Sequence, residues 1–388
     1  MSITTGMLIL CGPLLALEKF SADSLMLGLI GFGSAIFYAL GCAASGFWVD
    51  RFGSRKVITA ACLFLPVVFL SIFFVSRYRH LLLLTLAAGV GASLFWPAMI
   101  RWLGEDDCDE ALRRRVGNYN IALIGGVMVG PLASGFLFSI DYRFPFIIAA
   151  VLVTAILLIF HFRSKLPPVP PDFVLSGPEK EDRPAADRAG FDYIGWAANF
   201  GVWFAIGASQ TLFPELAQKL PAAIGERPLG VMIALIPAGQ VAVFILLRRW
   251  QRWHYNYTYL FLFQLLALVG LLILARNNNH LLFFAGFLGI GLAGGMTYFS
   301  SIYYSVYRQE KKGKKGGFHE SFLGLGVALG PLAGGLAGQQ MGLRAPYLLA
   351  ALVIAGSLLI QLLIRGFFIR KGWDGERRGA EVVFAERL

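Results

Sequence analysis

A short polar stretch, GFWVDRFGSRK at residues 46–56, separates two long apolar runs. About 25 mostly apolar or small residues precede it and about 19 follow, each near the ~20 that cross ~30 Å of lipid as a helix. Gly46 allows close helix approach, and Asp50 offers a carboxylate to a cation or to a helix N-terminus. Two membrane-spanning helices are therefore expected to meet here in a tight turn.

Composition extends this prediction to the whole chain. Its 388 residues are 57% hydrophobic and only 15% charged, which is far more apolar than a soluble domain. The net charge of +11 lies in short turns between apolar runs, as membrane topology requires, and this argues against nucleic-acid binding. The four cysteines form no CxxC pair and predict neither a disulfide framework nor a metal site.

Apolar runs bounded by polar or Gly/Pro residues predict twelve spans. The fold class is therefore an all-α membrane protein of 12 transmembrane helices in two six-helix, pseudo-symmetric bundles. The spans are expected at residues 2–17, 25–48, 56–76, 80–102, 118–139, 144–162, 192–213, 228–247, 257–275, 280–305, 318–338 and 345–368.

The distribution of basic residues predicts the orientation. The even-numbered turns, the central loop and the C-terminal tail hold 25 of the 34 Lys and Arg residues. Because basic loops stay on the cytoplasmic side, both termini are expected in the cytoplasm of a multi-pass protein of the inner (plasma) membrane.

The chain repeats itself at an offset of about 200 residues. The stretch HLL at 80–82 recurs at 280–282, and GPLA at 130–133 recurs at 330–333. Between the copies lies a Pro-rich, charged segment without apolar periodicity, which is typical of a linker. The predicted domains are a six-helix bundle at 1–163, a cytoplasmic linker at 164–190, a second six-helix bundle at 191–369 and a cytoplasmic tail at 370–388.

The opening stretch resembles the signature loop between helices 2 and 3 of the major facilitator superfamily, G-x-x-x-D-R-x-G-x-R-K. The matching residues are Gly46, Asp50, Arg51, Gly53, Arg55 and Lys56. The stretch at 126–135 is similar to the family's G-x-x-x-G-P-x-x-G-G motif, with Ser134 in place of one Gly, and in the family this motif leans towards antiporters. The resemblance implies a transporter that alternately opens to the two sides of the membrane.

The resemblance also implies a gate at the cytoplasmic side. By analogy, Asp50 caps the start of the eleventh helix near 316–319, while Arg55, Arg101 and Arg113 offer countercharges that close the inside. Gly130-Pro131 and Gly330-Pro331 admit two interpretations at this stage: packing surfaces without directional information, or the sliding contact between the halves.

In the superfamily, helices 1, 4, 7 and 10 line a central cavity. The in-span amides favour a cavity position because an unpaired amide in lipid is costly, whereas each aromatic residue could instead face lipid or pack between helices. The substrate-binding candidates are Trp96, Met99, Asn199, Trp203, Gln210, Gln240, Tyr298, Ser301 and Tyr304.

Charged groups within the spans are scarce. No Asp, Glu, Lys or Arg falls at the midplane of a predicted span, which favours a neutral or lipophilic substrate. His319 and Glu320 are candidates for proton coupling, the alternative being a helix cap. The acidic run at 105–110 precedes three arginines that neutralise it, so neither a metal nor a cofactor is expected.

The leading hypothesis is a monomeric secondary transporter that exports a small neutral or lipophilic solute, with proton antiport as one form of coupling. Facilitated uptake of a neutral solute such as a sugar is the nearest alternative, followed by a non-transporting receptor or assembly relative of the same fold. An intramembrane enzyme would need a catalytic His or paired acids facing a cavity. His161, His254, His80 and His280 lie at span ends, so no enzymatic activity is expected.

Overall fold

The computed structural model describes residues 1–103, 109–162, 190–250, 252–306 and 312–385. Apart from one short 3-10 helix, η1, every element in these residues is an α-helix. The first group comprises α1 (Ser2–Phe20), α2 (Ser24–Phe52), α3 (Ser54–Leu70), η1 (Ser71–Phe74), α4 (Tyr78–Leu103), α5 (Asp109–Phe138) and α6 (Phe144–Phe162). The second comprises α8 (Phe191–Gln218), α9 (Glu226–Arg249), α10 (Tyr257–Arg276), α11 (His280–Val306), α12 (Lys312–Met341) and α13 (Ala345–Ala385).

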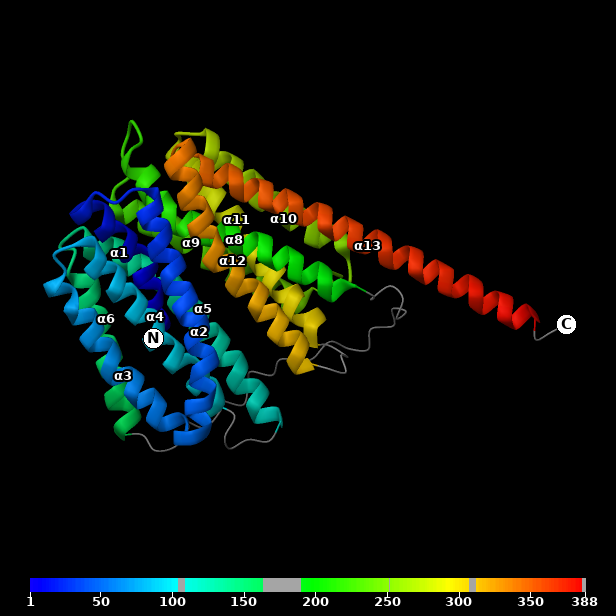
Figure 1. Ribbon diagram of the computed structural model, residues 1–388, viewed down its shortest axis with the longest axis horizontal. Coiled ribbons are helices and arrows are strands. Elements are labelled where there is room, and N and C mark those ends of the chain that lie inside the picture. Colours follow the sequence, from blue (N-terminus) through cyan, green and yellow to red (C-terminus); the bar gives the residue numbers. More distant parts are fainter. Residues whose placement is uncertain (104–108, 163–189, 251, 307–311, 386–388) are drawn as a thin grey trace.

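The helices form two groups that lie side by side (Figure 1). Helices α1–α6 make one half and α8–α13 the other, and α13 continues well past its neighbours. The halves meet chiefly where α2 packs on α12 and where α5 packs on α9. Because α2 corresponds to α9 and α5 to α12 in the 200-residue repeat, these two interfaces are repeat-related copies of each other.

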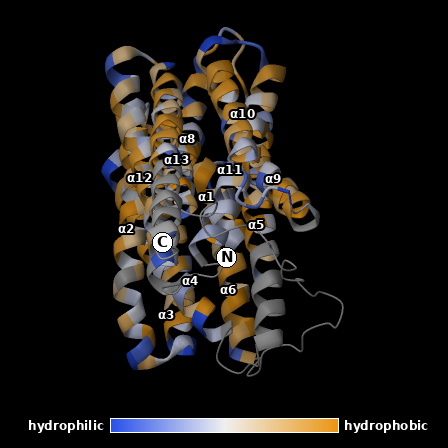
Figure 2. Ribbon diagram, turned by 90° about the vertical axis from the view of Figure 1, so that its right-hand side faces the viewer, coloured by the Kyte–Doolittle hydropathy of each residue, from blue (hydrophilic) through white to orange (hydrophobic). Residues whose placement is uncertain are grey.

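Ten helices in the described part of the chain are long and apolar enough to cross a membrane. In α5 the described apolar part, Ala122–Phe138, is shorter, and α8 carries polar residues such as Asn199 and Glu215. Figure 2 shows hydrophobic residues along the helices and hydrophilic ones at the turns of both ends. The predicted all-helical membrane fold is confirmed.

Helix α8 is polar because it is buried in protein. Most of its residues from Phe191 to Ala217 are buried, and it packs against α11, α12 and α13 while also reaching α1 and α2 in the other half. An unpaired polar side chain is costly in lipid but can be accommodated among neighbouring helices. This environment accounts for the lower hydropathy of α8.

A pair of glutamines joins α10 to α13. Gln264 Nε2 donates to Gln361 Oε1 at 3.0 Å, and Gln361 Nε2 donates to Gln264 Oε1 at 2.8 Å. Gln361 Nε2 also lies 3.0 Å from the Ser357 hydroxyl, which donates to the Ala197 carbonyl on α8. Both glutamines are fully buried, so this network holds three helices of the second half together.

Replacing Gln264 with leucine is expected to lower the free energy of unfolding by ~1 kcal/mol, because the side-chain oxygen of Gln361 loses its donor in an apolar interior. The double variant Gln264→Leu/Gln361→Leu is expected to recover part of that loss, since neither amide is then left unpaired. Thermal unfolding of the two purified variants in detergent measures both effects. A double variant less stable than the single one would contradict the pairing argument.

Candidate functional site

The two halves are in close backbone contact at the end of the bundle where α2 begins, here called the Ser24 end. A Cβ atom added at Gly28 would lie 2.5 Å from the carbonyl oxygen of Pro331 and 3.1 Å from the Cα of Gly335. At the repeat-related interface, a Cβ at Gly230 would lie 2.5 Å from the carbonyl oxygen of Pro131. Such distances require glycine, so the Ser24 end is closed by direct helix-on-helix packing.

The two Gly-Pro pairs divide their contacts between the halves. Gly130 packs on Gly6 of α1 and Gly330 packs on Phe204 of α8, each within its own half. Pro131 instead contacts Gly230 of the other half, and Pro331 contacts Gly28 and Gly31. The glycines thus pack within each half, and the prolines contact both their own half and the other. Whether these faces slide during transport stays a prediction.

The opposite end, which carries Asp50, lacks these contacts. A Cβ atom added at Gly46 on α2, or at Gly316 or Gly317 on α12, would meet nothing within 4 Å. Figure 1 shows α2 and α12 approaching each other at the Ser24 end and diverging towards the Asp50 end. The described helices are thus closed at one end and open at the other.

Asp50 does not cap the eleventh helix in this arrangement, which differs from the sequence expectation. It forms an ion pair with Arg101 of α4, within its own half, and both side chains are well exposed. Gly46 likewise has no neighbouring helix to approach. The physical reason is the separation of the halves at this end, which leaves α12 out of reach of the loop.

The remaining loop residues shape the turn itself. Gly53 has φ of +84°, a conformation that favours glycine, and it joins α2 to α3. Arg55 Nη2 donates to the Phe160 carbonyl of α6 at 3.2 Å. Arg51 lies over the Phe52 ring, and Lys56 is exposed. Arg113 lies in α5, but its side chain is outside the described residues.

Glu320 lies close to tyrosines of both halves. Its carboxylate interacts electrostatically with Tyr38 of α2, Tyr119 of α5 and Tyr298 of α11. The ring of Trp96 on α4 packs edge-on against Tyr119, with centroids 6.1 Å apart. The Glu320 side chain is 62% exposed within the protein, so it is accessible among these aromatic rings. We call Glu320, Tyr38, Tyr119, Tyr298 and Trp96 the aromatic site.

His319 is fully buried beside the aromatic site. Its Nδ1 lies 2.8 Å from the Ser301 hydroxyl, and its Nε2 lies 3.8 Å from Glu320 Oε1. The ring of Tyr298 packs against the imidazole at 5.1 Å. Because α12 begins at Lys312, His319 and Glu320 lie about two turns inside the helix and do not form its cap.

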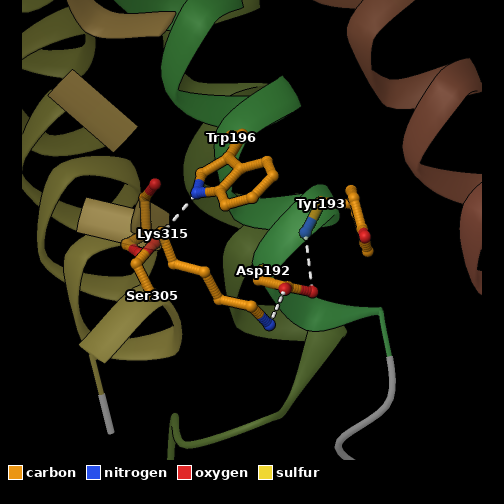
Figure 3. Close-up of polar contacts among 6 residues, drawn as sticks. Asp192, Tyr193, Trp196, Ser305 and Lys315 are labelled. Atoms are coloured by element: carbon orange, nitrogen blue, oxygen red, sulfur yellow. Dashed lines mark hydrogen bonds and ion pairs between the residues drawn. The ribbon is translucent and has the colours of Figure 1, made fainter. Parts of the chain in front are cut away.

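Two contacts join α8 to the helices that carry Tyr298 and His319, namely α11 and α12 (Figure 3). The indole Nε1 of Trp196 on α8 donates to the Ser305 hydroxyl of α11 at 2.8 Å. Lys315 of α12 pairs with Asp192 of α8 at 2.5 Å, and Asp192 also accepts from the Tyr193 amide. The ends of α8, α11 and α12 are thereby tied together on the Asp50 side.

Two substrate-binding candidates lie away from the aromatic site. Tyr304 is buried in a separate aromatic cluster with Trp253 and Tyr255. Gln240 packs against Gly294 and Gly295, between α9 and α11. Both pack within the second half, and their role in binding a substrate stays a prediction.

Two other substrate-binding candidates, Trp203 and Ser301, lie beside the aromatic site. Trp203 packs against Tyr298 with ring centroids 6.2 Å apart, and Ser301 binds His319. Asn199 is fully buried on α8, and both of its amide atoms lack a hydrogen-bond partner in the described structure. Met99 packs against the hydrophobic core that both halves share, and Gln210 is half-buried. Tyr38 and Tyr119 were missed because neither lies on a helix expected to line the cavity.

Comparison with known proteins identifies the fold. The family model of the Major Facilitator Superfamily matches residues 1–220 and 195–384. The chain belongs to the major facilitator superfamily. The family expected from the sequence is thereby confirmed.

Solved structures of the superfamily share this architecture. A bacterial homolog of the human lysosomal transporter Spinster, in an inward-facing and unoccupied conformation, matches with a TM-score of 0.68 at 14% identity over 95% of this chain and 92% of that one. The nucleoside transporter NupG matches with a TM-score of 0.70 at 12% identity over 95% and 96% of the two chains. At these identities the likeness establishes the fold alone.

Two curated relatives are multidrug resistance proteins of Bacillus subtilis (strain 168). Multidrug resistance protein 1 is 27% identical over 143 residues, or 34% of this chain and 37% of the relative. Multidrug resistance protein 2 is 27% identical over 132 residues, or 31% of each. This chain therefore matches only about a third of the length of each of these relatives.

Replacing Asp50 with asparagine is expected to lower transport several-fold while leaving the abundance of the protein nearly unchanged. The exposed pair with Arg101 contributes only ~0–1 kcal/mol to stability, so its loss does not unfold the protein. Closure of the Asp50 end would bring the carboxylate to α12, where the charge is needed. Flux in vesicles, normalised to protein content, measures this effect, and unchanged flux would remove Asp50 from the gate.

Proposed function

We propose that the protein exports small lipophilic or amphipathic solutes from the cell by alternating access, with proton antiport as the driving reaction. The aromatic site is the observation that carries this proposal, because the exposed Glu320 carboxylate interacts electrostatically with tyrosines of α2, α5 and α11, and Trp96 of α4 packs against one of them. Aromatic rings offer apolar contact area to varied solutes with few directional constraints.

The direction of transport follows from the orientation. In this proposal the Asp50 end, which is the basic end, faces the cytoplasm, and both termini lie there. The described arrangement is then open to the cytoplasm, where an exporter loads its solute. The partial similarity to two multidrug resistance proteins supports export of more than one compound.

Glu320 and His319 are the proposed coupling groups. The carboxylate is accessible in the arrangement open at the Asp50 end, and the imidazole beside it is buried and joined to Ser301. An amphipathic solute whose polar group donates a hydrogen bond to the ionised Glu320 carboxylate would compete with a proton for that carboxylate. This competition is the minimum requirement for antiport.

The proposal is tested by transport into proteoliposomes. Purified protein is reconstituted, and the flux of a panel of lipophilic dyes and neutral sugars is measured with and without a pH gradient. If the protein exports lipophilic solutes by proton antiport, the dye flux is expected to rise several-fold when the pH gradient is imposed. Sugar flux that ignores the gradient would indicate facilitated uptake, and absence of flux for every compound would favour a receptor or assembly relative.

The quaternary state belongs to the same proposal. We infer a monomer, because the two halves of one chain already cover each other through α2 on α12 and α5 on α9. Its partners are then the solute, the lipid bilayer and protons. Light scattering of the purified protein in detergent measures the mass directly.

A further inference from the structure

A buried carboxylate connects the two halves at the Ser24 end. The Ser24 hydroxyl, on the first residue of α2, donates to Glu215 Oε2 at 2.5 Å, and Glu215 belongs to α8 of the other half. Glu215 Oε1 pairs with Lys219 Nζ at 2.7 Å. The Glu215 side chain is 3% exposed, whereas Lys219 is 56% exposed. The buried carboxylate of Glu215 thus has one partner in its own half, Lys219, and one in the other half, Ser24.

The position of Glu215 makes it depend on these partners. It lies in the last turn of α8, where the helix dipole disfavours an anion, and burial removes the water that would otherwise solvate it. Tyr347 of α13 also interacts with the carboxylate electrostatically, but its hydroxyl makes no hydrogen bond in the described structure. Across the interface the hydrogen bond to the carboxylate comes from the Ser24 hydroxyl. The neighbouring Asp23 has only acceptor oxygens, and it accepts from the Met26 amide.

Glycine packing permits the Ser24–Glu215 contact. Gly338 and Gly335 of α12 lie against Ser24, and Gly28 lies one turn further along α2. The close approach of α2 to α12 therefore places Ser24 at the end of α8. When the Ser24 end opens, this bond must break, and Glu215 then becomes exposed to the solution on that side.

A second hydrogen bond joins the halves at the same end and offers a comparison. Arg227 Nε of α9 donates to the Ser139 hydroxyl beyond α5 at 2.9 Å. This contact is exposed, and the Arg227 guanidinium also lies over the Phe136 ring at 4.9 Å. Because exposed contacts compete with water, the Arg227–Ser139 bond contributes little to holding the halves together.

We propose that Ser24 and Glu215 form a latch that sets the balance between the state open at the Asp50 end and the state open at the Ser24 end. The latch stabilises the described state, because the buried charge is hydrogen-bonded across the interface only while the Ser24 end is closed. The proposal concerns the equilibrium between the two states and does not depend on which solute is carried or on how transport is driven.

The latch is tested by measuring the distance between the halves at the Ser24 end. Spin labels are attached to cysteines at Arg77 and Ala223, two exposed positions on opposite halves, in a full-length chain without its native cysteines. Electron resonance distances in lipid nanodiscs then report the fraction of molecules open at that end. Ser24→Ala is expected to raise the ratio of open to closed molecules about tenfold, the change expected for a buried hydrogen bond to a charged group.

Three further variants make the result specific. Glu215→Gln preserves side-chain volume but removes the charge, so it is expected to raise the same ratio, and adding Ser24→Ala to it is expected to have a smaller effect than in the unmodified chain. Ser139→Ala, which removes the exposed contact, is expected to change the ratio less than about twofold. Unchanged distances in both Ser24→Ala and Glu215→Gln, or an equal shift in Ser139→Ala, would overturn the latch.

Discussion

Replacing Gly28 with leucine is expected to reduce transport at least about tenfold, to the background of empty vesicles. The nearest atoms to a Cβ at this position are the Pro331 carbonyl oxygen and the Gly335 Cα, at 2.5 and 3.1 Å, and both belong to the backbone of α12. Backbone atoms cannot rotate away as a side chain can, so α2 and α12 would be held apart. A carrier that cannot close its Ser24 end cannot complete the cycle.

The control for this variant lies on the same helix. Gly46→Leu introduces the same side chain where no atom lies within 4 Å of a Cβ and where the residue is exposed. It is expected to leave the described state intact. Flux is measured for both variants at equal protein content, together with the label distance at the Ser24 end. Near-normal transport by Gly28→Leu would show that closure does not need this packing.

Replacing Glu320 with glutamine is expected to reduce gradient-driven transport about tenfold or more while leaving the unfolding temperature nearly unchanged. Its carboxylate is 62% exposed, and the nearest basic group that the described structure places beside it is His319, at 3.8 Å, so the fold does not rely on its charge. The glutamine cannot take up a proton, so the variant is expected to lose the response to the pH gradient rather than all affinity for the solute.

The matched control is Glu18→Gln, at an exposed carboxylate at the far end of α1. It is expected to transport normally and to retain the pH response. Dye binding, measured by fluorescence quenching, separates loss of coupling from loss of the site. If Glu320→Gln still accumulates dye against its gradient when a pH gradient is imposed, the coupling role proposed for Glu320 is wrong.

Sequence reasoning predicted the features that depend only on the order of residues along the chain. Apolar length and turn residues predicted the helices, and the repeat of GPLA at 130–133 and 330–333 predicted two related halves. Gly53 was expected in a tight turn and has a positive φ there. The division of the chain at 164–190 stays a prediction, because that linker lies outside the described residues.

The site residues are harder to predict, because the sequence alone does not fix the rotation of each helix about its own axis. Tyr304 is only six positions from Tyr298 on α11, but it packs into a separate aromatic cluster, whereas Tyr298 contacts His319. Six residues correspond to about 240° of rotation away from the starting direction, so the two tyrosines point to different sides. Tyr38 and Tyr119 were overlooked because family analogy directs attention to other helices.

The sequence by itself determined a helical membrane protein with two related halves and Gly-Pro pairs in matching helices, because apolar length and glycine spacing are local properties of the chain. Only the tertiary structure decided that the prolines contact the opposite half, that Asp50 pairs within its own half, and that Glu215 reaches Ser24. These contacts depend on the distance and rotation between packed helices. Packing across the whole bundle sets both quantities. Both change when a transporter switches between the state open to one side of the membrane and the state open to the other.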